Sequence, residues 1–145
     1  MNYENIPDQL RSIPQWVCHK NKQPYDPRIG TKAKANDPGT WTDFYTCSEY
    51  ARAYPEKYDG IGFEIQPLFV GIDLDHVVDP LTGVIEPWAK TIVDKLNSYT
   101  EYSPSGTGLH IFVYGTLPDG GNKRIIDKEK RQAIEMYSKN RYFTV

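Results

Sequence analysis

Two aspartates at the end of an apolar run are the first residues in this chain suited to chemistry. The segment Gly71-Ile72-Asp73-Leu74-Asp75 alternates along its length, as in a β-strand whose side chains point to opposite faces in turn. Asp73 and Asp75 then share one face, roughly 6–7 Å apart at the backbone. Carboxylates at this spacing can converge on one or two hard divalent cations, an arrangement suited to phosphate chemistry.

The aspartate pair alone is compatible with several roles. An Asp-x-Asp at a strand end is a turn cap about as often as it is a ligand pair. Glycosyltransferases use the same pattern to hold a metal-bound nucleotide sugar. An EF-hand calcium loop is excluded, because its glycine and terminal glutamate are absent. Two carboxylates on one strand face also repel each other, so we expect a positive group between them.

A glycine-containing loop and a histidine form the second candidate. In Ser105-Gly106-Thr107-Gly108, two glycines flank a hydroxyl residue and leave backbone N–H groups to cradle phosphate oxygens. His110 follows on the polar face of an alternating strand. A lone histidine there is more often a surface or satisfied residue, but after such a loop it is well placed to donate to a polyphosphate.

The third candidate is Glu135, which lies in the alternating run Ala133–Tyr137 on the face opposite Ile134 and Met136. A single strand glutamate is most often an exposed carboxylate. If the three strands are neighbours, however, Asp73, Asp75, His110 and Glu135 converge on one surface. That convergence is harder to assign to chance than any one motif.

The surrounding pattern predicts an α+β fold, with a mixed, largely antiparallel sheet and helices packed on one face. We expect a hairpin at Arg28–Gly30 and a helix capped by Thr46 or Ser48, with Tyr50, Ala51 and Tyr54 on its buried side. Other expected elements are a short helix at 6–11, a strand at 15–18, strands at 60–65 and 68–75 joined as a hairpin through Gln66-Pro67, a helix at 88–96 begun by Pro87, and strands at 99–102, 109–114, 133–137 and 142–145.

Bulk properties narrow the class of protein. The 145 residues suit one domain, and no apolar run approaches the ~20 residues of a membrane helix. Cys18 and Cys47 fit no metal spacing and indicate reduced cysteines in a cytosolic protein. The net charge of −2 requires that any nucleic acid be held by local basic patches, although ordinary solvated surface explains the mildly basic ends of the chain equally well.

The order of an apolar strand ending in Asp-x-Asp, a Ser-Gly-x-Gly-x-His loop and an apolar-Glu strand resembles the archaeo-eukaryotic primase superfamily. The closest likeness is to its phage and plasmid primase-polymerase domains. The resemblance covers nearly the whole chain, including the flanking segments 15–17, 22–27, 37–41, 58–63, 99–106 and 141–145.

This resemblance implies an N-terminal αβ unit at about 1–60 and an RRM-like catalytic unit at about 60–145. It implies a DNA primase and polymerase that performs template-directed nucleotidyl transfer, with DNA template and primer and nucleoside triphosphates as partners. It places Mg²⁺ or Mn²⁺ at Asp73, Asp75 and Glu135. The nucleotide phosphates would contact Ser105 and His110, with Gly106, Thr107, Gly108 and Arg141 in the same pocket.

The family also implies a cytoplasmic location, in the host if the protein is phage-encoded, with no membrane partner. Lys22, Arg28, Lys32 and Lys34 fit an ordinary charged loop better than a template contact. The final residues resemble the middle of a strand, so we expect a fragment of a longer protein, which in this family often includes a helical region and a helicase. A nucleotide- or DNA-binding module without turnover and a metal-dependent nuclease are the rival functions.

Overall fold

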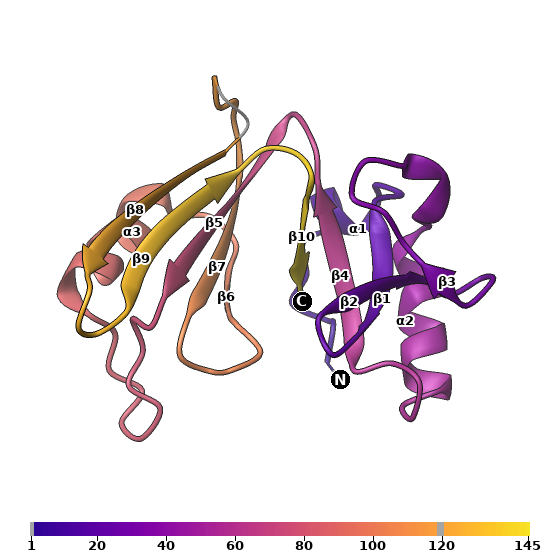
Figure 1. Ribbon diagram of the computed structural model, residues 1–145, viewed down its shortest axis with the longest axis horizontal. Coiled ribbons are helices and arrows are strands. Elements are labelled where there is room, and N and C mark those ends of the chain that lie inside the picture. The colour runs from indigo at the N-terminus through magenta and orange to yellow at the C-terminus, as the bar shows by residue number, and fades with distance from the viewer. Residues whose placement is uncertain (1, 119–120) are drawn as a thin grey trace. The chain divides into compact units, whose positions relative to one another are not determined.

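The computed structural model describes residues 2–118 and 121–145. The chain forms two compact units, one made of Met1–Ile65 and Asn140–Val145 and the other of Gln66–Lys139. Each unit has a five-stranded sheet and at least one helix (Figure 1). Every strand pairing among the described residues is antiparallel, which confirms the predicted α+β class.

In the first unit the strands lie in the order β10-β4-β1-β2-β3, and α2 packs against β1 and β4. Its elements are α1 (Asp8–Arg11), β1 (Trp16–Lys20), β2 (Gln23–Asp26), β3 (Thr31–Lys32), the 3-10 helix η1 (Pro38–Thr40), α2 (Phe44–Ala53), β4 (Gly60–Ile65) and β10 (Arg141–Thr144). The expected hairpin at Arg28–Gly30 is present as the turn between β2 and β3.

Trp16 is the centre of the first unit's core. Its ring is fully buried and meets the rings of Phe44 and Phe63 edge-on, with centroids 5.2 and 5.1 Å away. Its indole N–H donates to the backbone oxygen of Leu10 at 3.0 Å, so the polar end of the side chain is satisfied. This one residue therefore joins β1, β4, α1 and α2.

The start of α2 corrects the predicted cap. Asp43 is the N-cap, and its carboxylate accepts both the backbone N–H of Thr46 at 2.8 Å and the Thr46 hydroxyl at 2.7 Å. Thr46 is thus a donor to the cap, and the helix begins at Phe44. Ala51 is buried as expected, but Tyr54 is 40% exposed, so its ring is available at the surface.

The predicted hairpin across Gln66-Pro67 is wrong. β4 pairs with β1 and β10, whereas the next strand along the chain, β5 (Phe69–Asp75), pairs with β7 and β9 of the second sheet. All six residues of β4 are buried, so both faces of this strand are covered. Residues 66–68 therefore link two units, and both β4 and β10 lie in the first unit rather than after the expected division near residue 60.

In the second unit the strands lie in the order β6-β7-β5-β9-β8. Its other elements are α3 (Pro87–Leu96), β6 (Thr100–Tyr102), β7 (Leu109–Tyr114), β8 (Gly121–Asp127) and β9 (Gln132–Tyr137). Figure 1 shows α3 behind these strands, where Ala89 shares a buried apolar cluster with Ile72, Leu74 and Ile111. No helix among the described residues has the length and apolar character needed to cross a membrane.

Glu64 makes the stability of the protein depend on pH. It is fully buried on β4, and within the described part of the chain neither carboxylate oxygen has a hydrogen-bond partner. Burial raises the pKa of Glu64 from 4.5 to about 7. The folded protein therefore binds this proton more tightly than the unfolded chain, so the free energy of unfolding falls as pH rises from about 4.5 to about 7 and stays lower above that.

We expect Glu64→Gln to remove this fall, which amounts to at most about 3 kcal/mol. Urea unfolding of both proteins at several pH values between 4.5 and 8 measures it. The difference between wild type and variant isolates Glu64 from other titrating groups. A variant that loses as much stability across this range as the wild type would contradict the prediction.

Candidate functional site

Five side chains form a row across the second sheet, one from each strand. The register pairs Glu101 on β6 with His110 on β7, and His110 with Asp73 on β5. It also pairs Asp73 with Glu135 on β9, and Glu135 with Lys123 on β8. Directly opposed residues of antiparallel strands point to the same face. The row therefore lies on the face opposite α3, and the three strands expected to be neighbours are neighbours.

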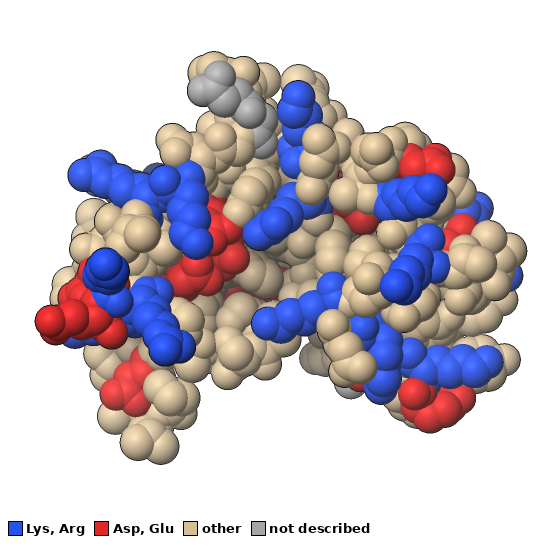
Figure 2. Space-filling view, in the orientation of Figure 1, with Lys and Arg blue, Asp and Glu red and all other residues tan. Residues whose placement is uncertain are grey.

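Each carboxylate in the middle of the row faces a donor. The His110 Nε2 atom lies 3.6 Å from Asp73 Oδ1, and the Lys123 ammonium lies 3.0 Å from Glu135 Oε1. The Tyr137 hydroxyl donates to the other oxygen of Glu135. Figure 2 shows acidic side chains of this unit beside basic ones. Lys123 thus places a positive charge beside Glu135, and His110 lies beside Asp73 and is charged only when its ring is protonated. The positive group expected between Asp73 and Asp75 stays a prediction.

Asp75 lies two residues beyond Asp73 on the same face of β5, opposite Ala133. Burial raises the pKa of Asp75, and the negative charge of Glu135 and a hydrogen bond with it raise that pKa further. The charges of His76 and Lys123 act in the opposite direction. Asp75 and Glu135 are therefore close enough to compete for the same positive charge.

The three carboxylates are the type of ligand that Mg²⁺ and Mn²⁺ prefer, because they offer only hard oxygen donors. As the side chains stand, however, residues 2–118 and 121–145 contain no group of three His, Cys, Asp or Glu placed to hold a metal ion. Glu135 contacts Lys123 and Tyr137 instead. Both oxygens of its carboxylate therefore already face a donor.

The loop between β6 and β7 satisfies most of its own backbone N–H groups. Gly106 donates to the Ser103 carbonyl at 2.8 Å, and Gly108 donates to the Ser103 hydroxyl at 3.0 Å. Thr107 donates weakly to the Ser105 hydroxyl at 3.3 Å. The sequence suggests that the backbone N–H groups of this loop cradle phosphate, but in the structure they already donate to acceptors within the loop. The groups that the loop presents are the hydroxyls of Ser105 and Thr107, 2.8 Å apart.

The same loop is fastened to the end of β5 that carries the aspartates. The Thr107 carbonyl accepts the N–H groups of Val77 at 2.9 Å and Val78 at 3.0 Å. A Cβ atom at position 108 would lie 2.9 Å from the Leu74 carbonyl, so Gly108 allows the loop to approach this closely. The loop hydroxyls therefore lie at the aspartate end of the sheet.

Two residues of the row, Glu101 and Lys123, were not predicted from the sequence. One Glu101 oxygen accepts the Tyr99 hydroxyl at 2.7 Å, and the other is buried with no partner within the described chain. Burial raises the pKa of Glu101 to about 7, although the Tyr99 hydrogen bond lowers it. The signal for Glu101 was the β6–β7 hairpin, whose register sets it opposite His110. Arg141, in contrast, lies on β10 of the first unit and is not part of this row.

Part of a known protein is similar in sequence to this chain. No family model matches the chain. The chain is 40% identical over 144 residues to a protein named DNA primase-polymerase from Nitratiruptor phage NrS-1, in an alignment that takes in 94% of this chain. The chain spans 19% of the length of that protein. The similarity supports a relationship to primase-polymerases for the segment that both proteins share.

The electrostatics of the row predict opposite effects of two substitutions on Asp75. Glu135→Gln removes a negative charge and is expected to lower the pKa of Asp75, whereas Lys123→Gln removes a positive charge and is expected to raise it. Carboxyl carbon chemical shifts followed by NMR over a pH titration measure both. Lys90→Gln on α3, whose ammonium pairs with Asp94, is the control and should leave Asp75 unchanged. Shifts in the same direction for both variants would contradict this account.

Proposed function

We propose that this chain is the nucleotidyl-transfer core of a DNA primase-polymerase. The observation that carries the proposal is the convergence of Asp73, Asp75, His110 and Glu135 on one sheet face, in a chain that aligns over 94% of its length with a phage DNA primase-polymerase. The proposed substrates are a primed DNA template and nucleoside triphosphates. A longer protein would supply further regions, such as a helicase.

In this proposal Asp73, Asp75 and Glu135 hold Mg²⁺ or Mn²⁺. Bound there, the ions would lower the pKa of the attacking 3′-hydroxyl and stabilise the charge on the departing pyrophosphate. The role of Lys123 is to neutralise Glu135 while no ion is bound. Its side chain is 58% exposed, so the ammonium can turn into solvent when an ion takes its place. The pKa of Asp75 is raised first by burial and then by the negative charge of Glu135, and that second effect also favours a bound cation.

Nucleotide recognition falls to the neighbouring groups. His110 is buried in the row between Glu101 and Asp73, and it donates a hydrogen bond to the triphosphate. The hydroxyls of Ser105 and Thr107 exchange their mutual hydrogen bond for bonds to phosphate oxygens, while Gly106 and Gly108 keep the loop tight. The role expected for Arg141, which belongs to the first unit, stays a prediction.

A binding module without turnover is the second candidate function. It is favoured by the absence of a ready-made three-residue metal group in the described chain and by the chain's short span relative to the phage protein. A primer-extension assay with Mn²⁺ separates the two functions. Extension by this chain supports the enzyme. Nucleotide or DNA binding without extension, when a version with downstream sequence does extend, supports the binding module.

Asp73→Asn is expected to reduce nucleotide incorporation by about 100-fold or more, because it removes a charged metal ligand. It is also expected to abolish the rise in melting temperature that Mn²⁺ causes in the wild type, while stability without metal changes little. Asp94→Asn, at an exposed acid on α3, is the matched control and should behave as wild type in both measurements. A large loss of stability without metal would instead identify Asp73 as a structural cap.

His110→Ala is expected to weaken binding of a nucleoside triphosphate by roughly 10-fold, the value of one charge-assisted hydrogen bond. Fluorescence titration with a labelled nucleotide measures the affinity, and steady-state extension shows whether KM changes more than kcat. His76→Ala, at an exposed histidine just beyond Asp75, provides the comparison. An unchanged nucleotide affinity in His110→Ala would remove this residue from the site.

A further inference from the structure

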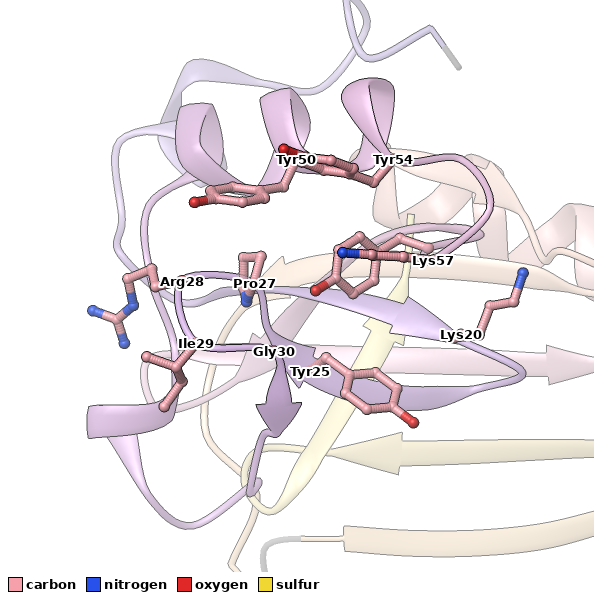
Figure 3. Close-up of a pocket in the computed structure, with 10 residues that line it drawn as sticks. Lys20, Tyr25, Pro27, Arg28, Ile29, Gly30, Tyr50, Tyr54 and Lys57 are labelled. Carbon is pink, nitrogen blue, oxygen red and sulfur yellow. The ribbon is translucent and has the colours of Figure 1, made fainter.

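A groove on the first unit is lined by tyrosines and basic side chains. Its volume is about 550 Å³, within the roughly 300–1,000 Å³ typical of ligand sites. All of its lining residues belong to the first unit, and Figure 3 shows how they lie between α2 and the β2–β3 hairpin. The candidate site on the second unit's sheet contributes none of them.

Aromatic rings border two sides of the groove. Tyr50 and Tyr54 lie one helical turn apart at the end of α2, with centroids 5.9 Å apart and planes inclined by 28°. Figure 3 shows Tyr25 on β2 across from them, and its ring centroid lies 6.3 Å from that of Tyr58. Tyr54 is 40% exposed, so part of its side chain lies outside the buried core. The stacked pair therefore presents π-surface to the groove.

The charged residues that line the groove are all positive. Lys20, Arg28 and Lys57 line it, and no carboxylate does so among the residues that the structure describes. Lys20 forms an ion pair with Asp59 at 2.8 Å, and Arg28 forms one with Asp26 at 2.7 Å. The Lys57 ammonium lies 4.9 Å from the centroid of the Tyr54 ring, and residues 2–118 and 121–145 place no acid within ion-pair distance of it.

We propose that this groove binds single-stranded DNA, with bases stacked on Tyr50 and Tyr54 and backbone phosphates at Lys57 and its basic neighbours. Aromatic platforms combined with basic side chains bind single strands without regard to sequence, because every base has a π-face. Bases in a duplex are already paired and stacked, so a duplex offers only its phosphates. The choice of DNA rests on the proposed function, in which part of the template is unpaired.

A proline-rich peptide is the other occupant that an aromatic groove suggests. Such a peptide carries no obligatory negative charge, whereas each nucleotide brings one phosphate. Lys20 and Arg28 are paired with Asp59 and Asp26, so it is the charge of Lys57 that favours the nucleic acid.

The test uses the whole chain and a fluorescein-labelled oligothymidylate, with binding followed by anisotropy. Tyr54→Ala is expected to weaken binding by roughly 5- to 150-fold, the range for loss of one stacking platform. Tyr54→Phe keeps the ring and should bind as wild type. Tyr45→Ala is the matched control, because Tyr45 is a 64% exposed tyrosine of the same helix that does not line the groove. Lys57→Gln should reduce the salt slope of binding by about 0.7.

The proposal is overturned if the wild type binds no oligothymidylate, if Tyr54→Ala binds as tightly as Tyr45→Ala, if a duplex binds equally well, or if a proline-rich peptide displaces the oligonucleotide from the groove. Photocrosslinking of wild-type protein to an oligonucleotide carrying 5-iodouracil gives a result even where a variant fails to fold. A crosslink to Tyr50 or Tyr54 supports the groove, and crosslinks found only elsewhere refute it.

The experiments can refute DNA binding by the groove and the proposed enzyme activity independently of each other. If the wild type extends primers while Tyr54→Ala binds DNA normally, the groove is refuted and the enzyme stands. If binding depends on Tyr54 while no nucleotide is ever incorporated, the enzyme is refuted and the groove stands. Asp94→Asn, at an exposed acid on α3 of the other unit, should bind oligothymidylate through the groove as wild type does.

Discussion

The register of β5 with the strands on both sides of it is the constraint on which the second unit depends. Val70, Ile72 and Leu74 are buried on the face that packs with α3, and each contributes roughly 1.5–3 kcal/mol through burial. A slip of one residue would expose these side chains and bury Asp73 and Asp75 in their place. The energy of the apolar face therefore holds the acidic face in position, and the site needs no separate device to align its strands.

The acidic face itself opposes stability. Buried and half-buried carboxylates stand close together there, and the pKa of Asp75 is raised in part because Glu135 is its neighbour. His110, Lys123 and Tyr137 offset this cost through contacts with the carboxylates. These donors balance the carboxylates only through side-chain contacts, so a ligand of higher positive charge can replace them.

Sequence reasoning predicted the faces of β5, β7 and β9 because alternation along a strand is a local property that side-chain types reveal directly. It did not identify β8, whose residues are largely exposed along their whole length and show no apolar alternation. Lys123 was missed with it. The hairpin predicted between β4 and β5 failed for a different reason, since both strands are strongly apolar and their choice of partner depends on residues far away in the chain.

The cap of α2 also depended on the folded geometry and was therefore predicted wrongly from the sequence. Thr46 is a common cap residue, and only the folded geometry reveals that it donates to Asp43. The roles of Asp73, Asp75, His110 and Glu135 remain predictions, because the structure fixes where these side chains lie and not what they bind. Tyr54 had been expected to be buried, but its side chain is exposed where it lines the groove of the first unit.

The return of β10 to the first unit has a consequence for how the protein is made. β10 pairs with β4, but the whole second unit lies between them in the chain. During synthesis β4 therefore leaves the ribosome well before its partner, and one of its edges stays open while the intervening unit is translated and folds. The nascent first unit has to shield that edge, or depend on a chaperone to do so, until its last strand arrives.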